Sequence, residues 1–414
     1  MGHSLAALAA IAGAPLAGAA LALRPAWRVG WRERLGGGPA APSGAAPVWI
    51  HGASVGEARV VLRLVDALRG EGQEVVASTS TATGRALLRE ERPELVCGLA
   101  PLDHPWLVAR ALGRMAPSLL VLVETELWPC WIQAAAARGI PVVVVSARIS
   151  DRSWPRYRRG FRLLAPTLGR LAAVGARSSV DGERFEQLGV AAERVSVTGD
   201  LKLEPPARVP RLAPELAAAL EGPPLFVAGS THEGEEQAAL GALAEVEAAG
   251  QRPALLLAPR HPQRNARVAQ VVRAAGRTLR LRSELPGAPL AAGEVLLLDT
   301  LGELAAVYSA AEVAFVGGSL VPVGGHNLLE PIQSGRAVLF GPHTQNARSA
   351  AALVLENGWG QRVDAAGLGQ AVGEALAAPD AWRERGTRAR AGLAVHAGST
   401  ERTTQLLRRF LKAP

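Results

Sequence analysis

The chain has 414 residues, of which 49% are hydrophobic and 20% are charged, so it is long and apolar enough for two packed domains and is not a disordered chain. Its formal net charge of +8 suits an anionic partner, although only Lys202 and Lys412 among 45 basic residues are lysines, so arginine-rich codon usage explains the charge equally well. Cys97 and Cys130 fit no metal-binding spacing and no disulfide framework, which indicates a reducing compartment.

The N-terminal stretch 4–23 carries no charge and is long enough to span a bilayer. Arg24, Arg28, Arg32 and Arg34 follow it, and by the positive-inside rule they keep this flank in the cytoplasm. We therefore expect a membrane anchor over residues 1–28, with the catalytic body on the cytoplasmic side of a bacterial inner membrane. A cleaved signal peptide and a helix lying on the membrane surface are the alternatives.

The stretch 48–57, VWIHGASVGE, predicts a strand, a tight loop of small residues and the start of a helix. Such a loop lies at the carboxyl end of a parallel strand, where open α/β sheets bind ligands. Ser54 and Glu57 have the spacing of a capping box. Glu57 is therefore either a helix cap or a carboxylate at the rim of a cleft that acts as a general base.

The remainder of the first half continues the alternation of strands and helices. Glu124 and Glu126 follow a buried strand within 118–132, and 141–150 is a continuous apolar strand of the kind that parallel sheets bury on both faces. Lys202 follows a short strand and hints at a specific contact, because an ammonium does not replace a guanidinium. We expect the first domain over 40–204.

A proline-rich stretch, 205–224, predicts a linker, and a second domain is expected over 225–398. Its first strand, loop and helix (224–236) repeat the pattern of 48–57. Arg260 and His261 follow a strand within 253–264. In 312–346, two glycine pairs precede a helix expected to begin near His326 or Asn327, and a helix start of this kind can bind an anion.

The last segment, 399–414, is amphipathic and is expected to cross back onto the first domain. The chain has neither the phosphate-loop pattern nor a dinucleotide-binding fingerprint, which argues against those two enzyme classes. The motif-bearing loops follow strands in both halves. We therefore predict an α/β protein of the GT-B type, with two facing Rossmann-like β/α domains, an interdomain cleft and an N-terminal membrane-anchor helix.

Nine short motifs now support a closer comparison. They are HGASVGE (51–57), ETELWP (124–129), SARISDRS (146–153), GDLK (199–202), STHEGEE (230–236), PRH (259–261), GEL (302–304), GGHNLLEP (324–331) and GPHTQN (341–346). In this order they resemble the 3-deoxy-D-manno-octulosonic acid (Kdo) transferases of lipopolysaccharide assembly over nearly the whole chain. The resemblance implies a GT-B glycosyltransferase at the inner membrane, with CMP-Kdo as donor and a lipid A precursor as acceptor.

The resemblance also implies roles for individual residues. Glu57 would be the catalytic base and Glu124 a second carboxylate that supports the site or the acceptor. Contacts to the acceptor phosphate or the Kdo carboxylate would come from Ser54, Arg148, Lys202 and Ser230. Contacts to the donor would come from Arg260, His261, the turn of Gly302, Glu303 and Leu304, Asn327 and, for the ribose hydroxyls, Glu330. No metal ion and no cofactor are expected.

Three other classes of protein are compatible with parts of the sequence. A different GT-B enzyme shares the fold, but the motif series and the anchor favour a Kdo transferase. A non-enzymatic binder of anionic lipid would use the basic surface and ignore CMP. A nucleic-acid partner is not expected, because only 4% of the residues are aromatic and no recognised nucleic-acid-binding module is present.

Overall fold

The computed structural model describes residues 29–41, 46–205 and 210–411. The chain forms two compact units, one ending at Glu204 and rejoined by the chain from Gly398, the other spanning Pro205–Ala397. The predicted anchor over 1–28 lies outside the described residues. Within the described part of the chain, no helix has both the length and the hydropathy to cross a membrane.

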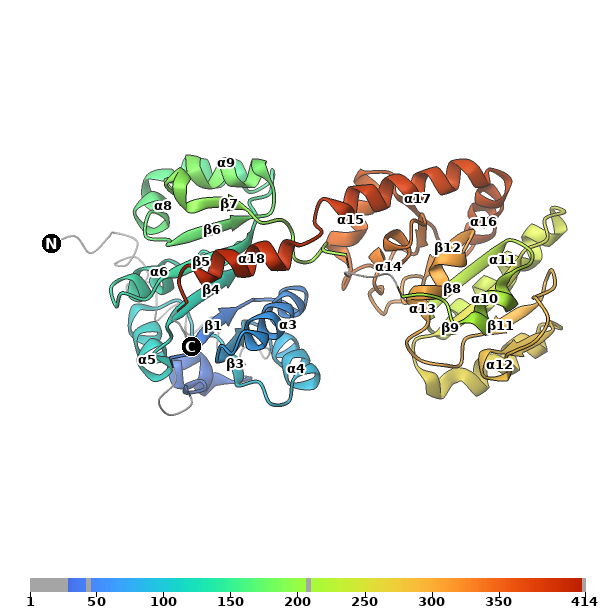
Figure 1. Cartoon of the computed structure of the whole chain (residues 1–414), viewed down its shortest axis with the longest axis horizontal. Helices are drawn as coiled ribbons and strands as arrows, with labels where there is room; N and C mark the ends of the chain where they lie inside the picture. Colours follow the sequence, from blue (N-terminus) through green and yellow to red (C-terminus); the bar gives the residue numbers. More distant parts are fainter. Residues whose placement is uncertain (1–28, 42–45, 206–209, 412–414) are drawn as a thin grey trace. The chain divides into compact units, whose positions relative to one another are not determined.

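The first unit contains a seven-stranded sheet in which every pair of neighbouring strands is parallel, in the order β3-β2-β1-β4-β5-β6-β7 (Figure 1). Its strands are β1 (Val48–His51), β2 (Val75–Thr79), β3 (Cys97–Leu99), β4 (Leu119–Val123), β5 (Val142–Ala147), β6 (Ala173–Ala176) and β7 (Val195–Val197). Its helices are α3 (Val55–Gly70), α4 (Ala82–Glu91), α5 (Pro105–Met115), α6 (Pro129–Ala136), α7 (Trp154–Arg159), α8 (Phe161–Leu168), α9 (Ser179–Gln187) and α18 (Ser399–Arg408), with short turns η1 (Glu33–Gly37) and η2 (Ala192–Arg194).

Strand β4 explains why this sheet is buried on both faces. Its five residues are fully buried, and alternate side chains enter two different cores. Leu120 and Leu122 pack with residues of α5, α6 and α9, whereas Leu119, Val121 and Val123 pack with residues of α3, α4 and α18. A continuous apolar run is the sequence signature of such a strand, since neither face meets water.

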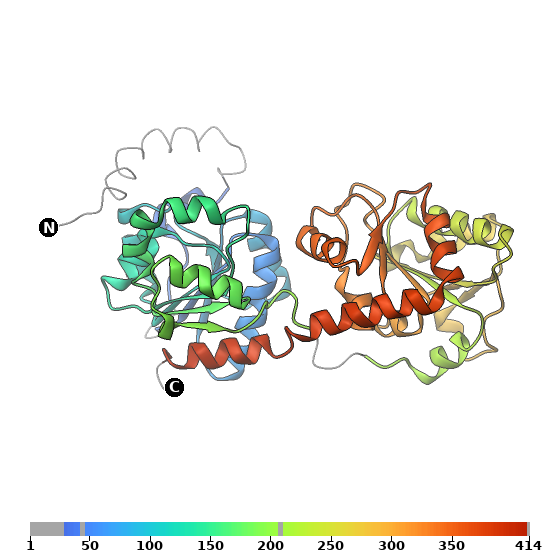
Figure 2. The same ribbon diagram turned by 90° about the horizontal axis from the view of Figure 1, so that it is seen from above.

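Helix α18 belongs to the first unit although it ends the chain (Figures 1 and 2). It packs against α3 and β6, and its Leu406 and Leu407 enter the same core as α3. The N-terminal residues 29–41 also belong to this unit, because η1 packs on α5 and β3. Arg34, one of the predicted flanking charges, is buried there and donates to the carbonyl of Ser80 at 2.9 Å. The charge of Arg34 is therefore buried within the folded first unit.

The second unit repeats the design with a seven-stranded parallel sheet in the order β10-β11-β9-β8-β12-β13-β14. Its strands are β8 (Leu225–Thr231), β9 (Ala254–Pro259), β10 (Leu279–Leu281), β11 (Val295–Leu297), β12 (Val313–Val316), β13 (Val338–Phe340) and β14 (Gly360–Arg362). Its helices are α10 (Pro214–Leu220), α11 (Glu235–Ala248), α12 (Asn265–Ala274), α13 (Leu304–Val307), α14 (Leu329–Gln333), α15 (Arg348–Glu356), α16 (Leu368–Ala377) and α17 (Pro379–Ala394), with turns η3 (Pro262–Arg264), η4 (Arg282–Glu284) and η5 (Tyr308–Ala310).

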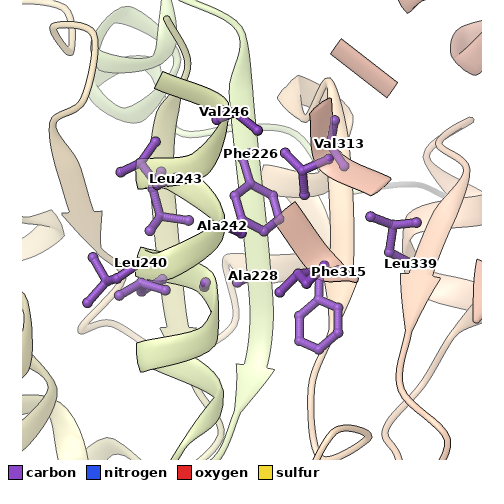
Figure 3. Close-up of a cluster of buried hydrophobic side chains, with 14 of the residues drawn as sticks. Phe226, Ala228, Leu240, Ala242, Leu243, Val246, Val313, Phe315 and Leu339 are labelled. Carbon is purple, nitrogen blue, oxygen red and sulfur yellow. The ribbon is translucent and has the colours of Figure 1, made fainter. Parts of the chain in front are cut away.

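A core of this unit lies between the sheet and the helices α11 and α16. Phe226, Phe315 and Leu339 from three strands belong to the same buried cluster as Leu243 and Val246 of α11 (Figure 3). Helix α10 lies within the range predicted as a linker, yet its Leu216 and Ala219 are fully buried. The stretch between the two units is therefore shorter than the proline content indicates.

Candidate functional site

The loops that carry the first unit's motifs meet where the strand order reverses. The chain runs outward from β1 to β2 and β3 and then returns to β4 on the other side of β1. In an open parallel sheet this switch point separates the loops at the carboxyl ends of the two central strands and leaves a place for ligands. The loop after β1 leads into Glu57, and Glu124 follows β4 directly.

Glu57 is held by its own turn at the start of α3. Its Oε1 accepts from Ser54 Oγ at 2.7 Å and its Oε2 accepts from the N–H of Ala53 at 2.6 Å. Ser54 in turn accepts from the N–H of Glu57 at 3.3 Å, which is the predicted N-cap. The carboxylate is only 8% exposed. The cap is thus real, and it fixes the orientation of a buried carboxylate at the switch point.

Glu124 forms an ion pair with Lys202 beside this turn. Burial raises the pKa of the Glu124 carboxyl; Lys202 acts in the opposite direction, and the nearby Glu57 and Asp200 add to the rise. The backbone of Glu124 is in the left-handed region at φ 62°, which is strained for a residue with a side chain. A Cβ placed on Gly56 would lie 3.4 Å from Lys202 Nζ, so the ammonium lies against the start of α3. The structure therefore brings Ser54, Glu57, Glu124 and Lys202 together.

Two further strand ends position Lys202 and Arg148. The N–H of Lys202 donates to Asp200 at 2.9 Å, and the N–H of Leu201 donates to Ser146 Oγ at 2.9 Å at the end of β5. Arg148 follows the same strand, and its Nε is buried without a hydrogen-bond partner among the described residues. A buried N–H donor on a cationic side chain that lacks a partner can be satisfied by a bound anion.

His51, which was not predicted as a site residue, is fully buried at the end of β1. Its Nδ1 lies 3.0 Å from Ser78 Oγ, which also accepts from the indole N–H of Trp49 at 2.8 Å. Its Nε2 lies 3.8 Å from Glu126 Oε2, and Glu126 accepts from the indole of Trp128 at 2.6 Å. Glu126 is therefore held by the indole of Trp128, in contrast to Glu124, which is paired with an ammonium.

The second unit has its own switch point between β8 and β12. The buried Glu235, at the start of α11, ties the two loops together. One of its oxygens accepts from the N–H of Gly318 at 2.6 Å and of His232 at 2.9 Å, and the other from Ser319 at 2.9 Å and Leu320 at 2.8 Å. Glu236, its neighbour, receives two bonds from Arg264 at 2.8 and 3.1 Å. Both carboxylates of this acidic helix start are structural.

Three imidazoles lie together at this edge, each from a different motif. The rings of His232 and His326 are nearly parallel, with 5.0 Å between their centroids, and they meet edge to edge with their Nε2 atoms 2.8 Å apart. His261 meets His232 edge-on at 5.4 Å. Arg260 is exposed at the end of β9, and only its backbone N–H has a partner, the carbonyl of Thr231 at 3.0 Å. Of these residues, only Arg260 and His261 were predicted.

The other predicted donor residues have partners within the unit. Glu303 receives bonds from Arg282 at 2.8 to 3.1 Å; burial raises its pKa, but the bonds from Arg282 and Thr300 outweigh burial and the pKa is lowered. Asn327 donates to Glu330 at 3.1 Å, and its Oδ1 accepts from the N–H of Leu329, the first residue of α14, at 3.2 Å. The remaining positions are Gly302 (φ 84°, exposed), Leu304 (first residue of α13) and Ser230 (φ 56°, in β8). In the described ranges, no group of three or more histidine, cysteine or acidic side chains is arranged to hold a metal ion.

The model of a family described as 3-Deoxy-D-manno-octulosonic-acid transferase (kdotransferase) matches residues 29–204. A 3-deoxy-D-manno-octulosonic acid transferase of Bordetella pertussis is 40% identical over 381 residues, which cover 89% of this chain and 88% of that protein. Its counterpart in Haemophilus influenzae is 33% identical over 317 residues, which cover 75% of this chain and 74% of that one. In fold, the chain is similar to the calicheamicin glycosyltransferase CalG4, with a TM-score of 0.51 at 15% identity over 90% of this chain and 100% of that chain. The chain therefore belongs to the Kdo transferase family of lipopolysaccharide biosynthesis, and it is a glycosyltransferase with two Rossmann-like units.

Proposed function

We propose that this enzyme transfers Kdo from CMP-Kdo to a lipid A precursor, lipid IVA, and releases CMP. The observation that carries the proposal is the convergence of Glu57, Glu124 and Lys202 at the switch point of the first unit's sheet. A buried, oriented carboxylate can take the proton of an acceptor hydroxyl, and an adjacent cation can hold an anionic group of the substrate. In this proposal the acceptor binds to the first unit and the donor binds to the second.

Glu57 is the proposed general base. Its hydrogen bonds from Ser54 and Ala53 fix the carboxylate, and each oxygen retains a lone pair for an acceptor hydroxyl. The hydroxyl oxygen attacks the anomeric carbon of Kdo, the bond from that carbon to the phosphate oxygen breaks, and Glu57 holds the released proton. Attack opposite the leaving phosphate inverts the configuration at this carbon. Glu124, whose pKa is raised and whose charge is paired with Lys202, supports the site.

Lys202 and Arg148 are the proposed anion contacts on the acceptor side. Lys202 is already paired with Glu124, so a substrate anion would share or replace that carboxylate. Arg148 retains a buried Nε–H without a partner in the described structure, and an acceptor phosphate or the Kdo carboxylate would satisfy it. Arg260, His261 and the Asn327–Glu330 pair are the proposed donor contacts in the second unit.

The test of this function is product analysis. The purified full-length enzyme is incubated with CMP-Kdo and tetraacylated lipid IVA, and mass spectrometry should show the acceptor heavier by Kdo together with free CMP. UDP-N-acetylglucosamine in place of CMP-Kdo should give no product. Transfer from the UDP-sugar, or release of CMP without a heavier acceptor, would contradict the proposed reaction.

Membrane attachment by residues 1–28 is a further part of the proposal. The uncharged run 4–23 and the arginines that follow it support an anchor in the inner membrane, with both units in the cytoplasm. The full-length chain should sediment with membranes even in high salt, whereas a chain lacking residues 1–28 should be soluble and active. Recovery of the full-length chain in the soluble fraction at low salt would refute the anchor.

A further inference from the structure

The glycine-rich loops of the second unit do not offer free backbone donors to an anion. The N–H groups of 318–320 donate to Glu235, and those of 324–325 donate to the carbonyl of Gly318 at 3.1 and 2.7 Å. The loop after β12 is thus an anion-binding turn already filled by a carboxylate of its own chain. A phosphate bound at this edge has to be held by side chains.

The short helices near these loops are weak anion sites, because little dipole builds up over so few residues. Helix α13 has four residues and α14 has five, and the Glu303 side chain just before α13 is engaged by Arg282. At the start of α14, the N–H of Leu329 already donates to Asn327 at 3.2 Å. Among the described residues, the side chains at this edge that suit a phosphate are those of Arg260, His261 and the paired His232 and His326.

His232 and His326 form an imidazole–imidazole hydrogen bond. His232 Nε2 and His326 Nε2 are 2.8 Å apart, so one of the two nitrogens carries a proton and the other accepts it. Gly318 makes room for both rings: a Cβ on this residue would lie 2.7 Å from His326 and 3.5 Å from His232. The N–H of His232 is fixed by Glu235. The pair is therefore a built feature of the switch point, held by both of its loops.

We propose that the His232–His326 pair is a phosphate-binding site that takes up one proton when the phosphate of the donor nucleotide binds. The proposal rests on the donor site proposed above for the second unit. A neutral pair holds one proton on each ring, with one of these in the shared bond. One added proton gives the pair a charge of +1 and a further N–H donor, which suits a phosphate monoester such as that of CMP.

The charges around the pair favour this behaviour near neutral pH. Burial lowers the pKa of His232; His261 and Arg264 from the β9 loop act in the same direction, while Glu235 and Glu236 of α11 oppose them. His232 is thus uncharged near neutral pH when no ligand is bound. An incoming phosphate adds negative charge beside it, raises its affinity for a proton and draws one from solvent.

The test is calorimetry of CMP binding to the full-length enzyme near neutral pH, in two buffers that differ in ionisation enthalpy. The wild-type enzyme should take up as much as one proton on binding CMP. His232→Asn and His326→Asn should bind CMP about tenfold more weakly and lose the uptake, because a neutral amide adds no proton. Cytidine, which has no phosphate, should bind the wild type and both variants alike and without proton uptake.

His104→Asn is the matched control. His104 caps α5 in the first unit by accepting from the N–H of Trp106 at 3.3 Å, and asparagine serves the same cap. This variant should retain wild-type affinity and proton uptake. If His326→Asn does not fold, His326→Gln reports on the same pair with a longer amide.

Wild-type uptake and affinity in folded variants of both histidines would overturn the proposed pair. If Arg260→Ala weakens CMP binding in the same series, only the pair is refuted and the donor site stands. If the wild-type enzyme does not bind CMP at all, the proposed donor site and the pair are refuted together.

Discussion

Replacement of Glu57 by glutamine distinguishes the proposed role of Glu57 as general base from its role as helix cap. Glutamine has nearly the same shape, and its amide can serve both partners: the oxygen accepts from the N–H of Ala53, and the NH₂ donates to Ser54 Oγ. The change alters one buried hydrogen bond, so we expect the first unit to lose no more than about 1 kcal/mol of stability. For a unit of this size that corresponds to a fall in melting temperature of about 2–4 °C. The amide cannot accept the acceptor's proton, so turnover should fall by at least about 100-fold.

The chain supplies its own control for this experiment. Ser178 and Asp181 form the same arrangement at the start of α9: Ser178 Oγ accepts from the N–H of Asp181 at 3.2 Å and donates to its carboxylate at 2.6 Å. A second oxygen of Asp181 accepts from the N–H of Ile149 at 3.0 Å. Asp181→Asn therefore exchanges carboxylate for amide in a cap that has no proposed role in catalysis, and it also removes an ion pair with Arg177 at 3.6 Å.

Melting temperature, CMP affinity and turnover should be measured on both variants. We expect similar losses of stability in the two, unchanged CMP affinity in Glu57→Gln, and a large loss of turnover in Glu57→Gln alone. Turnover within tenfold of wild type in a folded Glu57→Gln variant would refute the reasoning. Glu57 would then be a cap only, and Glu124 would be the next candidate for the base.

Three further variants test other parts of the structure. Arg260→Ala should weaken CMP binding by about 1.5–3 kcal/mol with no loss of stability, because the exposed guanidinium has no partner in the described structure; unchanged affinity by calorimetry would count against the donor site. Burial raises the pKa of Asp103 to about 6, although hydrogen bonds from Trp131 and Cys130 act in the opposite direction. Because the folded state then holds a proton that the unfolded state has lost, the free energy of unfolding should fall as the pH rises from about 4 to about 6, by at most about 3 kcal/mol. Asp103→Asn should remove that fall, and urea unfolding across this pH range would show whether it does. Glu235→Gln should destabilise the second unit by at least about 2 kcal/mol, because its NH₂ group would face two buried backbone N–H groups; a wild-type melting temperature would contradict this.

Much of the architecture could be predicted because long-range burial leaves local marks on the sequence. Runs such as 119–123 and 142–147 lie in strands buried on both faces, and a strand of this kind reads as an uninterrupted apolar stretch. The order of the strands does not leave such a mark. Short β3, which has three residues, and η1, which has a glycine in the left-handed region, carry too few residues for any periodicity to show.

The proline-rich stretch shows how local signals mislead. Proline at the first position of a helix stabilises its start, and Pro214 begins α10 in this way. The stretch 205–224 was predicted as a linker because its prolines read as breaks. Burial of Leu216 against the second unit, which no local pattern reveals, makes part of it a helix.

Of the candidate sites, the sequence indicated which loops meet but not which partners their side chains take. The capping box of Ser54 and Glu57 is local and was predicted from its spacing. The pairing of Glu124 with Lys202 joins residues 78 positions apart, and that of His232 with His326 joins residues 94 positions apart. Such contacts depend on the strand order, so only the fold reveals them.

The two units begin with the same pattern of strand, small loop and acidic helix start, yet they use their carboxylates differently. A carboxylate has about four lone-pair positions. In the described structure Glu235 receives four backbone N–H groups and is fully buried, so it has no position left for a substrate proton. Glu57 receives two donors, which leaves about two positions open. Saturation of Glu235 ties the two loops together and occupies four of their backbone donors, so side chains are the natural anion contacts there. The incomplete saturation of Glu57 is the physical reason to place the base in the first unit.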